Sequence, residues 1–445
     1  MKPESVSTKQ ERIAEMARRN PAMVFTSLNH YLDEEWLRYA YERTRRDGAV
    51  GVDGQTASDY EEHLEENLRS LLSRLKSGRY KAPPVRRAYI PKADGSQRPL
   101  GIPTFEDKVA QRAIVMLLGP IYECDFSDCS FGFRPGRSAH QALRHLRACI
   151  MEQGGRWVLD VDVRKYFDTI DHQRLRELLA LRVADGVVRK MLDKWLKAGV
   201  LEEGQWTRID QGTPQGGVVS PLLANIYLHY VLDGWYEREV APRMRKRSSL
   251  VRYCDDFVMV FENFLDCIRV LRVLGKRLER FGLSLHPDKT RMVDFRFKRL
   301  NGERHPACQA TSFNFLGFTH VWGKSRRGRT VVVQRTAKDR YARALRALHE
   351  WCRRHRHWPV TVQHAALSRV MKGHYAYYGI TGNGHRLSWY GHAAQRIWRY
   401  WLSRRSRTGH ISWERFYRGI LARYPLPAPR IMHRYRYAVA SETVS

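Results

Sequence analysis

The chain has 445 residues, of which 43% are hydrophobic and 11% aromatic, so it can form more than one domain and is neither collagen-like nor wholly disordered. Its 78 Lys and Arg outnumber 46 Asp and Glu, which leaves a net charge of +32. A protein this basic repels itself unless it meets a polyanion, and a phosphate backbone is the usual one. We therefore expect a nucleic-acid partner. An acidic membrane surface is the rival partner, but the sequence carries no recognisable basic amphipathic anchor or lipidation signal.

The cysteines and the N-terminus indicate the cellular compartment in which the protein is found. The seven cysteines are odd in number and no two form a Cys-x-x-Cys pair, which argues against a disulfide framework and a zinc knuckle. Residues 1–5 lack the apolar core of a signal peptide. The most apolar stretch, 216–232, is interrupted by polar residues and falls short of the roughly 20 residues that span a bilayer. We expect a cytoplasmic protein without a membrane partner.

In chain order, the first 82 residues predict helices of mixed charge around a glycine-rich turn at 48–54. From residue 83 to about 321, short β-branched or aromatic runs alternate with helical periods, which is typical of α+β or α/β layers. The expected strands and helices of this part are strands at 86–90, 157–163, 250–261 and 292–297, and helices at 105–118 and 174–196.

Beyond the loop at 323–329 the pattern predicts helices almost throughout. Thr336 with Asp339 predicts a cap for the first of them, and a last helix begins at Ser412 and ends before Pro425. Residues 321–445 hold 26 Lys and Arg but only four acids, a net charge of +22, together with 7 of the 12 Trp and 10 of the 22 Tyr. This combination suits phosphate neutralisation and base stacking. A basic solvated surface over an aromatic core is the alternative.

Two expected strands carry carboxylates that need an explanation in so basic a protein. Asp255 and Asp256 lie between apolar runs, which predicts a β-hairpin with its turn at or near them. Alternation puts Asp160 and Asp162 on one face of the strand at 157–163. Carboxylates gathered there would repel one another, so Mg²⁺ or Mn²⁺ would have to compensate. Two such ions about 4 Å apart form a clamp that joins or cuts phosphodiesters. A purely structural Asp-Asp turn is the alternative.

Several blocks occur in the order that reverse transcriptases require. They resemble that family's motifs as follows: the first catalytic-aspartate motif at 162–167, the Pro-Gln-Gly block at 211–223, Tyr-x-Asp-Asp at 253–256, the lysine motif at 286–290 and the primer-grip turn at 315–318. The block Arg-Pro-Leu-Gly-Ile-Pro-Thr at 98–104 is more particular. With the Pro-Gln-Gly block and the segments 373–379 and 424–427, it resembles the reverse transcriptase–maturases encoded by bacterial group II introns.

This resemblance covers nearly the whole chain and implies a right-hand polymerase fold of the α+β class. The expected parts are an N-terminal extension (1–82), fingers and a palm with an antiparallel sheet (83–320), an all-α thumb or maturase domain (321–430) and a tail (431–445), and the boundary near 321 rests on the change in charge and periodicity. The implied activity is RNA-directed DNA polymerisation. The implied partners are deoxynucleoside triphosphates, an RNA template, a DNA primer or target, and the intron RNA, whose splicing and retrohoming the protein would assist.

The resemblance also implies roles for single residues. Asp162 and Asp255 would bridge two Mg²⁺ ions (Mn²⁺ being an alternative) with Asp256 beside them, and Asp160 would be structural. Lys289 would donate a proton to the pyrophosphate, and Phe167 would exclude a ribose 2′-OH, unless these are an idle surface lysine and a core ring. The remaining implied contacts are Lys92 and Arg98 with the incoming triphosphate, Gln215 and Gly216 with the nascent base pair, and Phe315, Leu316, Gly317 and Phe318 with the primer.

Independently, the basic C-terminal part suggests RNA contacts. Arg outnumbers Lys heavily there, and Arg is the better phosphate fork and stacking partner. The expected RNA-binding residues are Arg353, Arg354, Arg356, Arg404, Arg405 and Arg407. Merely solvated arginines are the alternative.

Two departures from the family pattern matter. Position 254 is Cys where the family usually has Ala, from which we expect little effect beyond sensitivity to oxidation. No H-N-H nuclease block or cysteine quartet follows the prolines near 429, which predicts a lineage without the endonuclease. A domesticated enzyme in phage defence, CRISPR spacer acquisition or DNA repair would share the chemistry and stays an alternative. A splicing factor with a relic polymerase is disfavoured, because all three carboxylates are present.

Overall fold

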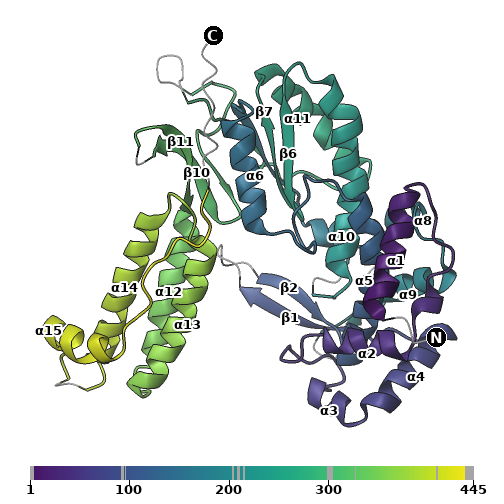
Figure 1. Cartoon of the computed structure of the whole chain (residues 1–445), viewed down its shortest axis with the longest axis horizontal. Coiled ribbons are helices and arrows are strands. Elements are labelled where there is room, and N and C mark those ends of the chain that lie inside the picture. Colours follow the sequence, from purple (N-terminus) through teal and green to yellow (C-terminus); the bar gives the residue numbers. More distant parts are fainter. Residues whose placement is uncertain are drawn as a thin grey trace. The chain divides into compact units, whose positions relative to one another are not determined.

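The computed structural model (Figure 1) describes residues 5–91, 95, 97–202, 205–207, 211–213, 216–297, 304–325, 327–406 and 409–435. It has two compact units, Met1–Ala142 with Trp157–Arg291 and Leu143–Arg156 with Met292–Ser445. The fold is mixed α+β, which confirms the expected class. The expected domain boundaries at 82, 320 and 430 divide the chain differently and stay predictions.

The first unit contains most of the helices. In chain order these are α1 (Val6–Arg19), the 3₁₀ turn η1 (Asn29–Tyr31), α2 (Glu34–Glu42), α3 (Ala57–Glu62), α4 (Leu64–Lys76), α5 (Phe105–Asp125), α7 (Tyr166–Thr169), α8 (His172–Ala180), α9 (Gly186–Leu196), α10 (Ser220–Leu228), the π-helical η2 (His229–Asp233) and η3 (Tyr236–Val240), the 3₁₀ turn η4 (Ala241–Arg243) and α11 (Phe264–Glu279). Helix α6 (Ala139–Met151) leads from the first unit into the second.

Two sheets position the site in the first unit. One contains β6 (Ser248–Tyr253), β7 (Asp256–Phe261) and β3 (Trp157–Asp162) in that order, all antiparallel, and β8 (Arg291–Asp294) then carries the chain into the second unit. Strand β7 is central and almost wholly buried, and α11 packs beside it (Figure 1). The carboxylates therefore lie at the end of a rigid, apolar sheet.

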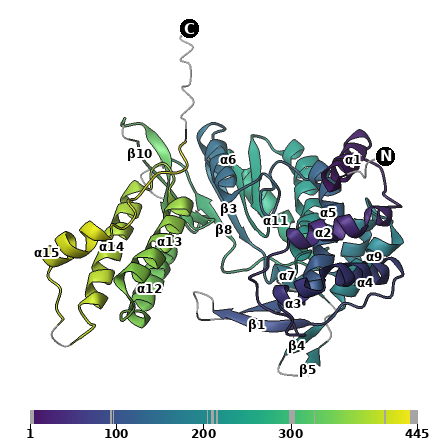
Figure 2. The ribbon, with the colours of Figure 1, turned by 60° about the horizontal axis from the view of Figure 1, so that its bottom comes forward.

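The second sheet has the order β2-β1-β4-β5. Strand β1 (Val85–Pro91) pairs antiparallel with β2 (Gln97–Ile102) and parallel with β4 (Val200–Glu202), which forms a hairpin with β5 (Gln205–Thr207) (Figure 2). The antiparallel register places Arg98 opposite Ile90. Both residues are exposed, so this hairpin presents a cation to solvent.

The single helix expected at 174–196 is two helices in the structure. Residues 174–196 span parts of α8 and α9, because α8 ends at Ala180 and Asp185 caps the start of α9. The Asp185 carboxylate accepts hydrogen bonds from the N–H groups of Val187 and Val188, and from those of Leu28 and Asn29 far along the chain. A cap shared with a distant segment cannot be recognised from local periodicity.

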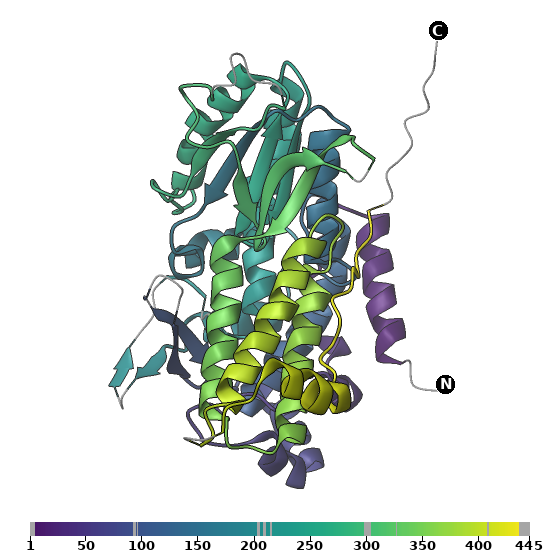
Figure 3. The ribbon, with the colours of Figure 1, turned by 90° about the vertical axis from the view of Figure 1, so that its left-hand side faces the viewer.

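The second unit combines a small sheet with a helical bundle (Figure 3). The sheet has the order β11-β10-β9, and the long helices run side by side. The elements are β9 (Phe313–Phe315), β10 (Phe318–Lys324), β11 (Thr330–Thr336), α12 (Lys338–Arg354), α13 (Val360–Tyr378), α14 (Gly384–Leu402), the short α15 (Trp413–Arg415) and the π-helical η6 (Phe416–Leu421). Buried Leu367, Leu387, Trp398 and Phe416 contribute to one apolar core among the helices.

Two local expectations for this unit are wrong and one is confirmed. The segment after the loop at 323–329 is a strand, β11, before helices begin. Thr336 does not cap α12; its hydroxyl oxygen accepts a hydrogen bond from Asn383 at 2.8 Å, and the helix starts after Ala337 without a side-chain cap. Ser412 does cap the last helix, by accepting from the N–H of Arg415 at 3.2 Å. In the described part of the chain, every helix is too short or too polar to cross a membrane.

Candidate active site

The β6–β7 hairpin presents its two-residue turn, Cys254 and Asp255, at the end of the sheet. Cys254 adopts a φ of 60°, a left-handed conformation that a non-glycine residue adopts only at a cost. The loop containing Gly132 lies directly against this turn, since a Cβ at Gly132 would come within 2.4 Å of the Cys254 nitrogen. The expected Asp-Asp hairpin is confirmed, and its turn is closely packed from one side.

The sheet register gathers the carboxylates. Asp162, the last residue of β3, pairs directly with Asp256, the first residue of β7, so their side chains leave the sheet on the same face. Asp255 lies in the adjacent turn. Burial raises the pKa of the Asp255 carboxyl group and the nearby Asp162 raises it further, whereas hydrogen bonds and Arg98 act in the opposite direction. Thus Arg98, on a separate sheet, is close enough to act on Asp255.

Two basic side chains, one in the lysine motif and one directly after it, pair with carboxylates of β3. Lys289 Nζ lies 3.4 Å from Asp162 Oδ2, and the turn that carries the lysine is attached to β3 by the hydrogen bond from His286 N–H to the Asp162 carbonyl at 2.8 Å. Arg291 Nε lies 2.9 Å from Asp160 Oδ2, and that side chain is only 15% exposed. Asp160 is therefore occupied by an arginine, while Asp162 keeps 41% of its side chain exposed for another partner.

The described residues include no group of three or more His, Cys, Asp or Glu already spaced to hold a metal ion. The donor chemistry nevertheless fits a hard cation, since two carboxylates, Asp162 and Asp255, repel each other at the edge of the sheet. A cation held by these two carboxylates would need further oxygen ligands, which substrate phosphates and water supply.

Two of the expected nucleotide contacts, Phe167 and Gly216, lie at close backbone contacts between motifs. Phe167, half-buried in α7, has its carbonyl bonded to the N–H of Thr213 at 2.8 Å, which fastens the Pro-Gln-Gly block to the aspartate motif. Gly216 has a φ of 121°, and a Cβ there would come within 2.6 Å of the Gly101 carbonyl oxygen. Only glycine fits such an approach to β2. Lys92 and Gln215 lie outside the described residues.

In the second unit, the expected primer-grip residues form a tight hairpin. Phe315 ends β9, Phe318 begins β10, and Leu316 and Gly317 make the turn with φ values of 49° and 79°. The Leu316 carbonyl accepts a hydrogen bond from Tyr377 Oη at 2.9 Å. The ring of Phe318 lies 5.8 Å from that of Tyr377. The segment 373–379 therefore supports this turn, a link between two motifs that the sequence alone does not reveal.

The expected RNA-binding arginines differ in the exposure of their side chains and in the partners that these side chains bind. Arg353 and Arg354 share the Glu350 carboxylate and keep 55% and 70% of their side chains exposed. Arg404 lies 4.4 Å above the Tyr400 ring, whereas half-buried Arg405 donates to the Trp358 carbonyl at 2.6 Å. Arg356 donates to the Arg353 carbonyl at 3.0 Å, and Arg407 lies outside the described residues.

Comparisons with known proteins decide the family. Residues 90–320 match the family model "Reverse transcriptase (RNA-dependent DNA polymerase)". The chain is 32% identical over 383 residues to Protein YkfC of Escherichia coli, which covers 77% of this chain and 96% of that protein. It is also 42% identical over 222 residues to "Group II intron-encoded protein LtrA" of Lactococcus lactis subsp. cremoris. The chain belongs to the reverse transcriptase family, and to its group II intron type.

The match to LtrA covers 49% of this chain and only 37% of LtrA. A further relative, "Nuclear intron maturase 2, mitochondrial" of Arabidopsis thaliana, is 31% identical over 185 residues, which are 33% of this chain and 25% of that protein. The resemblance stated from the motifs is thereby confirmed, and this reverse transcriptase is an RNA-directed DNA polymerase. The roles of its individual site residues stay predictions.

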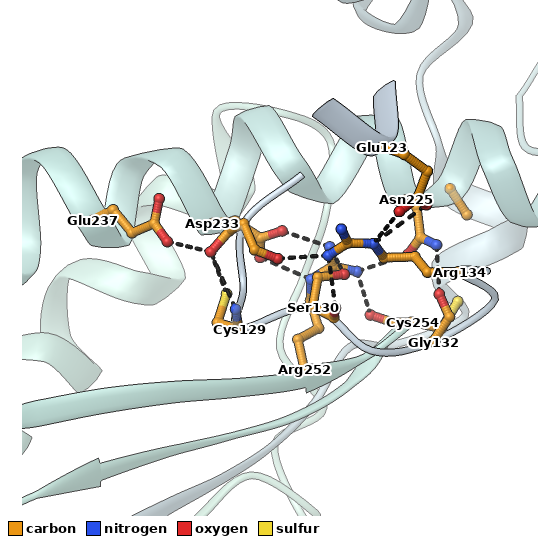
Figure 4. A network of polar contacts seen from close by, with 12 residues as sticks. Glu123, Cys129, Ser130, Gly132, Arg134, Asn225, Asp233, Glu237, Arg252 and Cys254 are labelled. Atoms are coloured by element: carbon orange, nitrogen blue, oxygen red, sulfur yellow. Dashed lines mark hydrogen bonds and ion pairs between the residues drawn. The ribbon is translucent and has the colours of Figure 1, made fainter. Parts of the chain in front are cut away.

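The sequence missed four polar residues beneath the Cys254–Asp255 turn. All four are buried, and Asp233, Asn225 and Ser130 each accept a hydrogen bond from Arg252 (Figure 4). A signal was present, because Arg252 and Asp233 each stand inside an apolar run, and a buried charge needs a partner. Periodicity predicts that such residues are buried, but it does not say which partner each one meets.

Proposed function

We propose that this reverse transcriptase copies RNA into DNA at the edge formed by Asp162 and Asp255. The observation that carries the proposal is the position of these two carboxylates at adjoining ends of β3 and the β6–β7 turn, within reach of Arg98 and Lys289. A site for joining nucleotides needs this combination, because anionic oxygens bind the metal and cations bind the phosphates.

Asp162 and Asp255 would hold Mg²⁺, or Mn²⁺ in its place, with Asp256 beside them. Two such ions, when bound, supply charge stabilisation for the attacking and leaving oxygens of the transfer. The chain's own residues do the rest. Arg98 binds the triphosphate with a bidentate fork, Lys289 leaves Asp162 to hold a proton for the departing pyrophosphate, and Phe167 excludes a ribose 2′-OH.

Two further nucleotide contacts are proposed from the same arrangement. The backbone at Gly216 would lie close against the nascent base pair, with Gln215 beside it, because glycine leaves room for that approach. Lys92 would join Arg98 at the triphosphate as a point charge.

The proposed domain arrangement is that of a right hand. Fingers and palm would occupy residues 83–320, after an N-terminal extension at 1–82, and a helical thumb would occupy 321–430, before a tail at 431–445. At the end of the fingers and palm, Phe315, Leu316, Gly317 and Phe318 would grip the primer. Support for this assignment comes from the tight turn at these residues and from Tyr377, which donates to the Leu316 carbonyl.

We further propose that the protein binds a group II intron RNA and assists its splicing and retrohoming. The names of LtrA and of Nuclear intron maturase 2 support this, as does the net charge of +22 over residues 321–445. The exposed arginines at 353, 354 and 404 are the proposed contacts, together with Arg356, Arg405 and Arg407.

A matched pair of carboxylate variants tests the site. Asp255→Asn should abolish primer extension on an RNA template, because the loss of a metal ligand removes several kcal/mol of transition-state stabilisation. Asp160→Asn should retain extension, since Asp160 binds Arg291 rather than the substrate. Template affinity, measured by filter binding, should be unchanged in both. Extension by purified Asp255→Asn at the wild-type rate would refute the site.

A further inference from the structure

The buried guanidinium of Arg252 lies directly beneath the catalytic turn (Figure 4). Both Arg252 and its partner Asp233 have side chains that are 0% exposed. Arg252 Nε donates to Asp233 Oδ1 at 2.7 Å, and Nη2 donates to Asp233 Oδ2 at 2.5 Å. This bidentate geometry fixes the plane of the guanidinium as well as its position.

The remaining donors of Arg252 reach three other segments. Nη2 also donates to Ser130 Oγ at 2.8 Å, and Nη1 donates to Asn225 Oδ1 at 2.9 Å and to the Cys254 carbonyl at 3.1 Å. An arginine has five N–H donors, and all five are used here. One side chain therefore ties α10, η2 and the loop at Ser130 to the first residue of the catalytic turn.

A second path reaches the same turn through its neighbour. Asn225 Nδ2 donates to the Gly132 carbonyl at 2.7 Å, and Gly132 lies against the Cys254 nitrogen. The backbone of Arg252 is itself held, since its N–H donates to the Cys129 carbonyl at 2.8 Å and its carbonyl accepts from the Phe131 N–H at 2.9 Å. The turn is thus supported on both sides by groups that Arg252 organises.

Stability alone does not explain so costly an arrangement. A buried ion pair loses its hydration, and well-packed apolar residues of similar volume usually stabilise a fold as well or better. The turn has a separate need, because Cys254 must hold a strained φ of 60° for the next residue, Asp255, to lie beside Asp162.

We propose that Arg252 is a positioning residue for the polymerase reaction, which orients Asp255 through the Cys254 carbonyl before substrate binds. It touches no reacting atom, so it is not a catalytic residue. The inference rests on the proposed function of Asp255 and adds four residues to it: Arg252, Asp233, Asn225 and Ser130.

Arg252→Lys tests this, because lysine keeps the charge beside Asp233 but cannot donate to all five of these acceptor atoms. The matched control is Arg182→Lys. Arg182 is 4% exposed, forms a bidentate pair with Asp125, and donates to the Met23 carbonyl at 2.6 Å in the same unit. It therefore has the same kind of buried network without contact to the catalytic turn.

We expect Arg252→Lys to lower kcat by about 10- to 100-fold, since a misplacement of roughly 1 Å costs that much, with the deoxynucleotide KM and RNA affinity nearly unchanged. Amide hydrogen exchange at residues 253–256 should become faster in the free protein. Arg182→Lys should lower stability without either effect. Equal kcat losses in the two variants, or unchanged exchange at the turn, would overturn the proposal.

If Arg252→Lys does not fold, the double variant Arg252→Met with Asp233→Leu replaces it, because removing both buried charges avoids an unpaired one. The same two criteria then apply. Hydrogen exchange needs no catalysis, so it also separates the two proposals. Activity retained by Asp255→Asn would refute the proposed site, whereas an unchanged turn would refute only the role of Arg252.

Discussion

At the scale of single residues, Phe167 gives the clearest test of nucleotide choice. Its ring is half-buried beside that of Tyr166, at 5.4 Å between centroids, so part of it faces solvent where a sugar could lie. Phe167→Ala should raise ribonucleotide incorporation relative to deoxynucleotide by opening space beside C2′. Single-nucleotide extension with matched dCTP and CTP measures the ratio.

The matched control is Tyr166→Phe. Tyr166 is buried and donates to the Ala224 carbonyl at 2.6 Å, so this change affects the same helix without opening the sugar side. An unchanged ratio in Phe167→Ala would mean that the ring only packs against its neighbours.

Cys254 shows where residue-scale reasoning needed the structure. The sequence placed a thiol in the catalytic motif, from which we expected sensitivity to oxidation. The side chain is 2% exposed and burial raises the pKa of its thiol, so little thiolate forms and reagents have no access. The neighbouring carboxylates were predictable because the motif fixes them, whereas burial depends on Gly132, which is remote in the sequence.

At the scale of elements, a buried chain of hydrogen bonds connects α5 to the Pro-Gln-Gly block. Asp107 accepts from Tyr80 and from Trp195 Nε1, and its other oxygen accepts from Gln111 Nε2 at 2.9 Å. Gln111 Oε1 in turn accepts from the Val219 N–H at 3.2 Å. The charge on Asp107 therefore sets the orientation of the Gln111 amide, and through it the end of the block.

Asp107→Asn should break this chain of hydrogen bonds at one of its two ends. An amide N–H in place of the carboxylate oxygen faces another donor, so either Trp195 or Val219 loses its acceptor, at a cost of about 1–3 kcal/mol of unfolding free energy. Urea denaturation measures this loss. Gln111→Glu is the complementary variant, since it keeps an acceptor for the Val219 N–H while it removes the donor to Asp107.

Asp107 also predicts that the stability of the fold depends on pH. Burial raises the pKa of Asp107 to about 6, against hydrogen bonds that lower it. The folded state therefore holds the proton more tightly than the unfolded chain, and this contribution to stability is lost as pH rises from about 4 to about 6. The difference in urea midpoint between wild type and Asp107→Asn should change over that interval and be constant above pH 7. A constant difference throughout would contradict the assignment.

At the scale of the whole molecule, charge predicts the mode of RNA binding. Each phosphate contact contributes about −0.7 to −0.9 to the slope of log K against log salt. Three phosphate contacts at Arg404, Arg405 and Arg407 would change the slope by about 2.1–2.7. Because Arg405 is engaged with Trp358, replacing all three by Gln should reduce the slope by only about 1.4–1.8, the value for two contacts. Filter binding at several salt concentrations checks this.

The control removes the same charge elsewhere, from the exposed Arg269, Arg272 and Lys276 of α11. Protein-assisted splicing at low Mg²⁺ should fall only in the first variant, while extension on a short unstructured template at saturating concentration persists. An unchanged slope with normal splicing would show that these arginines are merely solvated, and would direct the search to residues 1–82.

The parts of this molecule that sequence predicted are those with local signals. Alternating apolar residues predicted β3 and the β6–β7 hairpin, and ordered motifs predicted the carboxylates. The remainder depends on contacts between distant residues, such as Arg252 with Ser130, which are 122 positions apart. Neither hydrophobic periodicity nor secondary-structure propensity carries information about residues so far apart in the sequence. The hydrogen bonds beneath the turn could therefore not be predicted.

The π-helical segment that carries Asp233 has a consequence for how this protein can change its length. The N–H of Gly234 bonds to the carbonyl of His229, five positions back, so the segment holds one residue more per turn than an α-helix. Deleting a single residue there would restore ordinary α-helical winding but leave Asp233 on the same side of the helix axis, because one hydrogen-bonded turn would then take four residues in place of five. Its carboxylate would stay beside Arg252. A one-residue deletion within α10 would instead rotate Asp233 by about 100° about the axis and separate the pair. Natural variants and engineered chimaeras should therefore accept the loss of one residue in the π-helical segment but not in α10.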